Sequence, residues 1–237
     1  MALVSDTLSA SEMDKRIETT AQKSYVFNTY LKGDDIKLDS REGIVTLTGT
    51  VSEETHLALA AYTVVNLPGV KSIDNQLRVK GGIPEKNSDA WIRVRVKAML
   101  MLHRNLDGTN TEVDVKEGSV SLHGKASSRA EKELTTEYVK DVEGVKTVDN
   151  QMTLTKKIIN RHRMDVDFID DSSIKSQIEL ALLLHRGTSL FRTSVVVNSG
   201  VVTVMGKAKN VAEKKLINSR IEDIPGVKRI YNHMTIE

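Results

Sequence analysis

Three groups of evenly spaced glycines constrain the fold of this chain more than any other feature of its sequence. In each group the second glycine follows the first by 6 residues, the third follows after 20 more, and an asparagine follows after another 6. The groups are Gly43, Gly49, Gly69 and Asn75; Gly118, Gly124, Gly144 and Asn150; and Gly200, Gly206, Gly226 and Asn232. A motif repeated at fixed spacing indicates tandem copies of one structural unit. We therefore expect three small modules in this 237-residue chain rather than one large domain.

The residues between the glycines predict which elements each copy contains. Apolar residues such as Val120 and Leu122 alternate with polar ones after the first glycine, and this period of two is typical of a half-buried strand. Together with the β-prone run before that glycine, the pattern predicts a β-hairpin. A helix is expected past the second glycine, with Ser52, Ser128 and Asn210 as its caps in the three copies.

Each copy also opens with a predicted helix and closes with a predicted third strand. The expected opening helices are residues 12–31, 89–102 and 173–184. The order is therefore helix, strand, strand, helix, strand (αββαβ), and each helix has a single apolar stripe to bury. The predicted fold class is α+β: three tandem modules, each with a three-stranded mixed sheet packed against two helices.

The repeat also predicts where the modules begin and end. The first, second and third modules are residues 11–80, 88–155 and 170–237, joined by linkers 81–87 and 156–169. The second linker carries a basic cluster of Lys156, Lys157, Arg161, His162 and Arg163. Such a cluster either contacts phosphates or keeps an extended linker solvated.

Charge and cysteine content limit the classes of protein this chain can belong to. A net charge of +2 disfavours a strongly basic nucleic-acid binder. Because there is no cysteine, disulfides and thiolate chemistry are absent. No apolar run approaches the roughly 20 residues of a membrane-spanning helix, and residues 1–6 do not resemble a secretory signal. The chain is expected to be either cytoplasmic or a mature form whose signal has been removed.

The repeated motifs resemble those of the BON domain family. The resemblance rests on the run Gly43–Gly49, on Pro68–Lys71 with the Asn-x-Leu that follows, and on the opening helix Asp89–Ala98. It implies a bacterial envelope protein, located in the periplasm, that binds phospholipid surfaces or other envelope components and has no catalytic apparatus. It also implies a role in osmotic or envelope stress.

The sequence contains no recognisable catalytic or metal-binding motif. No histidine pair has the i,i+4 spacing of a metal site, and no nucleophile elbow, P-loop or dinucleotide fingerprint is present. We therefore expect no catalytic residues, no metal and no cofactor. His103 and His185 each end an opening helix; they are either polar residues favoured at a helix C-terminus or members of a shared pH-sensing or ligand site.

The single tryptophan suggests a lipid-binding site. Trp91 begins the opening helix of the second module and is followed by Arg93, Arg95 and Lys97. An aromatic ring beside basic side chains suits an anionic headgroup layer, so these four residues are the predicted lipid-binding site. The alternative is that Trp91 is a partly buried lid on the core and that the basic residues are ordinary surface.

The sequence therefore leaves two binding functions open. The first is contact with an anionic phospholipid membrane or with envelope proteins, by a monomer that does not bind nucleic acid. The second is a chaperone-like tandem that holds client polypeptides without lipid, because small sheets with open edges can accept an added strand.

Overall fold

A computed structural model describes residues 9–103, 106, 108, 110–155, 169–185, 188 and 192–237. The chain divides at Gly82 into two compact units. The first unit contains the first module, and the second unit contains the second and third modules together. None of the described helices is long and apolar enough to cross a membrane.

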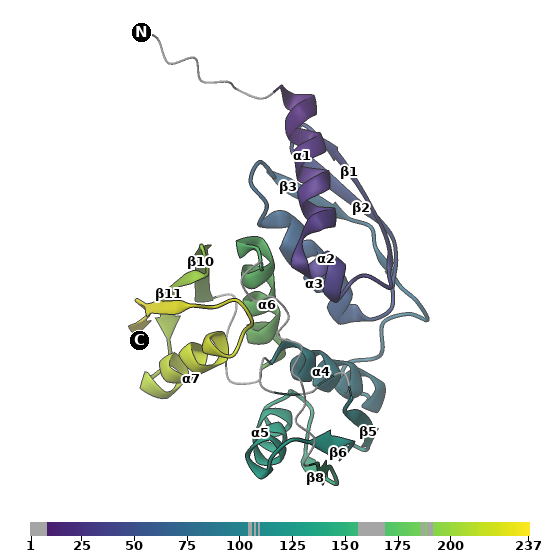
Figure 1. Cartoon of the computed structure of the whole chain (residues 1–237), viewed down its shortest axis with the longest axis vertical. Coiled ribbons are helices and arrows are strands. Elements are labelled where there is room, and N and C mark those ends of the chain that lie inside the picture. Colours follow the sequence, from purple (N-terminus) through teal and green to yellow (C-terminus); the bar gives the residue numbers. More distant parts are fainter. Residues whose placement is uncertain are drawn as a thin grey trace. The chain divides into compact units, whose positions relative to one another are not determined.

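The first module has the predicted order of elements (Figure 1). Its elements are α1 (Ala10–Lys23), α2 (Tyr25–Thr29), β1 (Asp35–Arg41), β2 (Ile44–Val51), α3 (Glu54–Val65), β3 (Ser72–Asn75) and β4 (Arg78–Val79). Strands β1 and β2 form the antiparallel hairpin, and β3 and β4 both pair with β2 in parallel. The sheet is therefore mixed, and β2 is its central strand.

The other two modules repeat this arrangement. The second contains α4 (Asp89–Leu102), β5 (Glu112–Lys116), β6 (Ser119–His123), β7 (Lys125–Ala126), α5 (Arg129–Lys140), β8 (Thr147–Asn150) and β9 (Thr153–Leu154). The third contains α6 (Asp171–Leu184), β10 (Thr193–Asn198), β11 (Val201–Ala208), α7 (Val211–Glu222), β12 (Arg229–Asn232) and β13 (Thr235–Ile236). The predicted αββαβ modules with mixed sheets are confirmed.

The central strand of each module has one buried face and one outward face. Its inward residues, Val45 and Leu47 in the first module and their equivalents in the others, are fully buried. Burial alternates along the strand, as expected when helices cover only one face of a sheet. Because Gly118 corresponds to Gly43 and to Gly200, each residue of the second module has an equivalent 75 residues earlier and 82 residues later.

The repeated glycines are required by turns and by close approach of the backbone. Gly43 has a φ of 80°, in the left-handed region that glycine adopts at least cost. At Gly49 an added Cβ would lie 2.0 Å from the carbonyl oxygen of Asp35 on β1. The fixed spacing of the repeated glycines therefore follows from the geometry of the hairpin.

The repeated asparagine breaks the third strand and anchors it to the second helix. The Asn150 Oδ1 accepts a hydrogen bond from the Met152 N–H at 3.0 Å, and its Nδ2 donates to the Lys132 carbonyl oxygen at 2.9 Å. Asn75 and Asn232 accept the equivalent bonds from Leu77 and Met234. The asparagine thus satisfies backbone groups at the interruption between β8 and β9, which is a structural role.

An aspartate on each opening helix holds the hairpin turn in place. Asp89 accepts hydrogen bonds from the N–H groups of Glu117 and Gly118, at 2.8 and 2.9 Å. Asp14 and Asp171 make the same pair of bonds in their own modules. The bonds from the turn lower the pKa of the Asp14 and Asp89 carboxyl groups. The spacing of the glycines did not predict this interaction between the aspartate and the turn.

Two local predictions for the first module are wrong. Ser52 does not cap α3: the capping residue is Glu53, which makes no side-chain cap, while the Ser52 N–H donates to Asp34. The opening helix is also not continuous to residue 31. It ends at Ser24, whose hydroxyl donates to the Ala21 carbonyl and accepts from the Phe27 N–H, because a serine side chain competes for helix backbone groups.

Candidate functional site at the contact between the second and third modules

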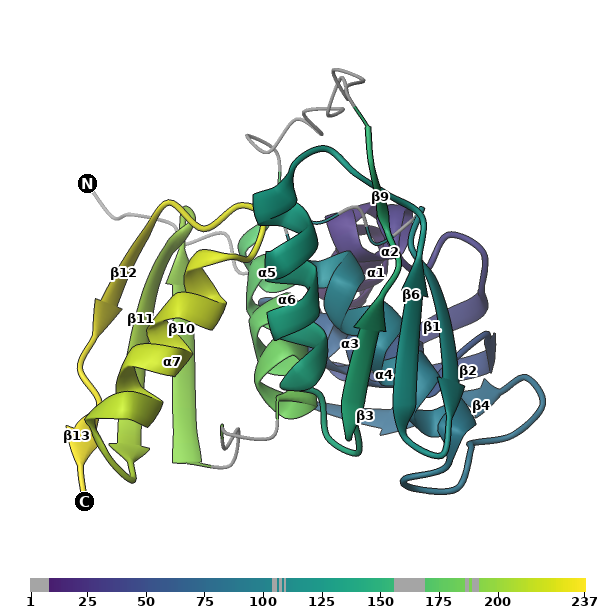
Figure 2. The ribbon, with the colours of Figure 1, turned by 90° about the horizontal axis from the view of Figure 1, so that it is seen from below.

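The second and third modules face each other through their helices. Figure 2 shows α5 and α6 between the strands of the third module and those of the second. Six residues from each module surround the contact, and every one in the second module is matched by its equivalent 82 residues later. These are Met99, Leu102, His103, Tyr138, Asp141 and Val142, with Ala181, Leu184, His185, Arg220, Asp223 and Ile224. The contact is therefore pseudo-two-fold symmetric.

Two equivalent histidine–aspartate pairs cross this contact, one in each direction. The His103 Nε2 lies 3.3 Å from an Asp223 carboxylate oxygen, and the equivalent His185 Nε2 lies 3.4 Å from Asp141. Each histidine is the C-cap of an opening helix, and each aspartate is the C-cap of a second helix. A carboxylate at a helix C-terminus is disfavoured by the helix dipole. Hydrogen bonds from the other module, donated to Asp223 by the Tyr138 hydroxyl and to Asp141 by the Arg220 Nη2, offset that cost.

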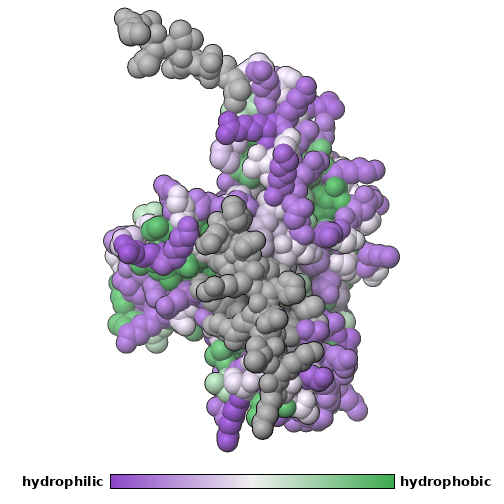
Figure 3. Space-filling view, viewed as in Figure 1, coloured by the Kyte–Doolittle hydropathy of each residue, from purple (hydrophilic) through white to green (hydrophobic). Residues whose placement is uncertain are grey.

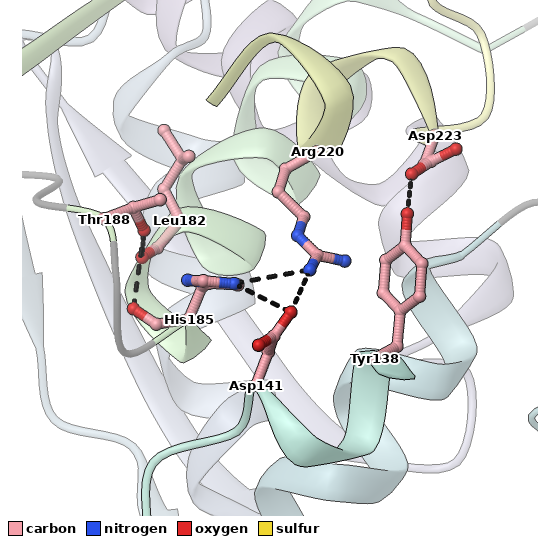
Figure 4. A network of polar contacts seen from close by, with 7 residues as sticks. All are labelled: Tyr138, Asp141, Leu182, His185, Thr188, Arg220 and Asp223. Atoms are coloured by element: carbon pink, nitrogen blue, oxygen red, sulfur yellow. Dashed lines mark hydrogen bonds and ion pairs between the residues drawn. The ribbon is translucent and has the colours of Figure 1, made fainter. Parts of the chain in front are cut away.

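The pseudo-symmetry is broken at Tyr138 and Arg220, which are equivalent positions. The Arg220 Cζ lies 3.8 Å from the centre of the Tyr138 ring. The Arg220 Nη2 donates to Asp141, and the Tyr138 hydroxyl donates to Asp223 (Figure 4). Burial lowers the pKa of the Arg220 guanidinium, while the neighbouring Asp141 acts in the opposite direction.

The arrangement joins the two modules through pairs of polar side chains. The pocket at this contact has a volume of about 30 Å³, far smaller than a typical ligand site. Among the residues that the structure describes, no group of three or more histidine, aspartate or glutamate side chains lies close enough to hold a metal ion. The histidines thus occupy the helix C-termini, and their carboxylate partners come from the neighbouring module.

The structure brings Trp91 and Arg95 together inside the second unit. Trp91 is 5% exposed and lies in the core of the second module. Arg95 is 8% exposed, its Cζ lies 4.3 Å from the Trp91 ring, and its Nη2 donates to the Leu183 carbonyl of α6 at 2.9 Å. This placement agrees with the interpretation of Trp91 as a lid on the core, and it leaves neither side chain at the surface.

The other predicted lipid-binding residues, Arg93 and Lys97, are half-buried on the same helix. Lipid contact through α4 therefore remains a prediction for these two side chains alone. The basic cluster of the second linker, within residues 156–163, lies outside the described residues.

Sequence reasoning missed the contact itself, although part of its signal was present. Asp141 and Asp223 both lie three residues before the third glycine of their modules. The first module has Asn28, Thr63 and Asn66 at the positions of His103, Tyr138 and Asp141. It therefore lacks the histidine and the carboxylate of this contact. A comparison of the three copies position by position distinguishes the first module from the other two.

Comparison with known proteins places these modules among described sequences. The BON domain family model matches residues 13–81, 88–156 and 170–237. The chain is 25% identical to osmotically-inducible protein Y of Escherichia coli (strain K12) over 143 residues. These residues cover 59% of this chain and 71% of that protein. Two structures of CdsD, a structural protein of the type III secretion system of Chlamydia trachomatis, align at 14% identity over 97% and 95% of this chain and 100% and 92% of theirs. Both have a TM-score of 0.25, a superposition too loose to bear on this chain.

Proposed function

Because the chain belongs to the BON domain family, with three copies in tandem, we propose that it is a non-enzymatic envelope protein that binds anionic phospholipid surfaces or other envelope components. The similarity to osmotically-inducible protein Y supports a role in osmotic or envelope stress. It also supports a periplasmic location. We expect the chain to act as a monomer, without nucleic acid.

The observation that supports this proposal is that, in the second unit, the helices of the second and third modules contact each other. The outward faces of their sheets take no part in that contact, so a partner can bind there. Because α5 and α6 lie between the two sheets (Figure 2), each outward sheet face is a separate surface for contact with a membrane or an envelope component.

The proposal is tested by co-sedimentation of the full chain with vesicles. We expect the chain to pellet with vesicles that contain anionic lipid and to remain in solution with neutral ones. Binding should weaken as salt rises from low to physiological concentration, because exposed charges are screened. A chain that stays in solution with both kinds of vesicle would contradict the proposal.

A second candidate function is the holding of client polypeptides. Strands β1, β5 and β10 each pair on one side only within the described sheets, and an unpaired strand edge can accept an extended segment. Protection of an aggregating client by a chain that binds no vesicles would favour this function over the first.

A further inference from the structure

The outward sheet face of the third module differs from those of the other two modules. Four equivalent outward positions are charged in the first and second modules and uncharged in the third. They are Lys37, Asp39, Arg41 and Asp74 in the first module; Glu112, Asp114, Lys116 and Asp149 in the second; and Ser194, Val196, Asn198 and Tyr231 in the third. These four positions are thus charged in two modules and uncharged in the third, where two of them hold Val196 and Tyr231.

Two side chains of this face, Val196 and Tyr231, lie in one row across the sheet on either side of Thr203. Val196 on β10 is paired with Thr203 on β11, which is paired in turn with Tyr231 on β12. Val196 and Tyr231 are 50% and 45% exposed, and Met205, two residues beyond Thr203, is 42% exposed. Figure 3 shows hydrophobic surface on the third module, where β10 and β11 lie. An exposed apolar patch on a sheet commonly marks an interaction site.

The charges on this face have a single sign. On the outward positions of β10, β11 and β12 the charged side chains are Arg229 and Lys207, and no carboxylate is among them. The Arg229 Nη1 donates to the Tyr231 hydroxyl at 3.3 Å, which holds the cation beside the aromatic ring. Glu237, just after β13, is paired with Arg192 at 3.0 Å.

We propose that the outward face of β10, β11 and β12 is the surface by which this chain lies on an anionic membrane, an inference that rests on the proposed function. Apolar and aromatic side chains enter the boundary between headgroups and acyl chains, and basic side chains pair with the phosphates. A second copy of the same face is disfavoured as its occupant, because the two faces would bring like charges together. The buried Trp91 is not needed for this contact.

The test replaces this face with the residues that the second module carries at the same positions. The triple variant Val196→Asp, Met205→His, Tyr231→Asp installs the equivalents of Asp114, His123 and Asp149. The second module has the same sheet with those residues, so the third should fold with them. We expect the partition of the full chain onto anionic vesicles to fall at least about tenfold, with an unchanged circular dichroism spectrum.

A matched pair of charge variants separates this face from overall charge. Arg229→Gln with Lys207→Gln removes two cations from the third module, and Lys116→Gln with Lys125→Gln removes two from the second. We expect the first pair to weaken binding about fivefold for each cation, since a basic side chain near an anionic surface contributes about 1 kcal/mol. The second pair should bind almost as the unaltered chain does.

The outcomes distinguish this inference from the proposed function. If the unaltered chain binds anionic vesicles and the triple variant binds equally well, the face is wrong and the lipid function stands. If the unaltered chain binds no vesicles, the lipid function fails and the inference fails with it. Self-association of the unaltered chain without vesicles, abolished in the triple variant, would assign the face to a second copy and overturn the inference.

Discussion

Tyr138 and Arg220 occupy the same position in two successive modules, and they stack on each other where those modules meet, with the Arg220 Cζ 3.8 Å from the ring centre. Two identical residues at this place would bring two rings or two cations together. One ring and one cation attract each other, and each donates a hydrogen bond to a carboxylate of the other module. Divergence between the two copies at this position thus makes the contact complementary.

We expect Arg220→Gln to lower the free energy of unfolding of the second unit by about 1–3 kcal/mol, because it removes a charged hydrogen bond and a stacking partner from a buried contact. Urea denaturation monitored by circular dichroism measures this loss. The control is Arg129→Gln, which breaks an exposed i,i+4 pair with Glu133 and should cost no more than about 0.5 kcal/mol. Equal losses in the two variants would contradict the account of the contact.

We expect Trp91→Ala to act on stability rather than on lipid affinity. Truncation of a buried tryptophan costs about 3–5 kcal/mol, and here it also removes the surface on which Arg95 stacks. Thermal unfolding and vesicle binding of the same preparation measure the two effects. Selective loss of vesicle binding, at an unchanged midpoint of unfolding, would restore Trp91 as a lipid-binding residue.

The Asp89 interaction with the hairpin turn predicts a pH-dependent effect. Hydrogen bonds from the N–H groups of Gly118 and Glu117 lower the pKa of the Asp89 carboxyl in the folded state below its ordinary value of 3.8. The carboxylate therefore stabilises the fold above pH 3.8, and this stability is lost as the pH falls through the folded-state pKa. Asp89→Asn should therefore lower the midpoint of thermal unfolding at pH 7, and the difference from the unaltered chain should shrink below pH 3.8. A difference that does not change with pH would show that charge has no part in holding the turn.

We expect Asn150→Ala to destabilise the second module by about 1–3 kcal/mol, because it leaves the Met152 N–H without its acceptor in a half-buried place. Chemical denaturation provides the measurement. The neighbouring Gln151 is exposed, and Gln151→Ala should change stability by less than about 0.5 kcal/mol. If both substitutions are equally mild, the repeated asparagine does not have the structural role described for it.

The order of elements within each module was predictable because it depends on the local spacing of turn glycines and helix-capping residues. The hairpin turn ends at Gly43 in the first module and at its equivalents in the others, and the helix caps Ser128 and Asn210 lie where the capping pattern places them. Where local rules compete, as at Ser24, the sequence predicted one helix and the chain forms two.

The fate of Trp91 and Arg95 could not be read from the sequence, because the partner that buries Arg95 is a backbone carbonyl 88 residues away, at Leu183. A run of aromatic and basic residues at the start of a helix has the same pattern whether it faces lipid or a second module. The contrast between the sheet faces also becomes visible only when register is known, since Val196, Thr203 and Tyr231 form one row through strand pairing.

The most direct measurement of the central claim is the loss of backbone amide signals of the full chain on bilayers of anionic lipid that carries a paramagnetic label in its headgroup. The account predicts that the amides of Val196, Met205 and Tyr231 lose the most intensity, while those of α4 and of the equivalent Asp114 and Asp149 are little affected. Loss centred on α4, or no loss anywhere in the third module, would contradict it.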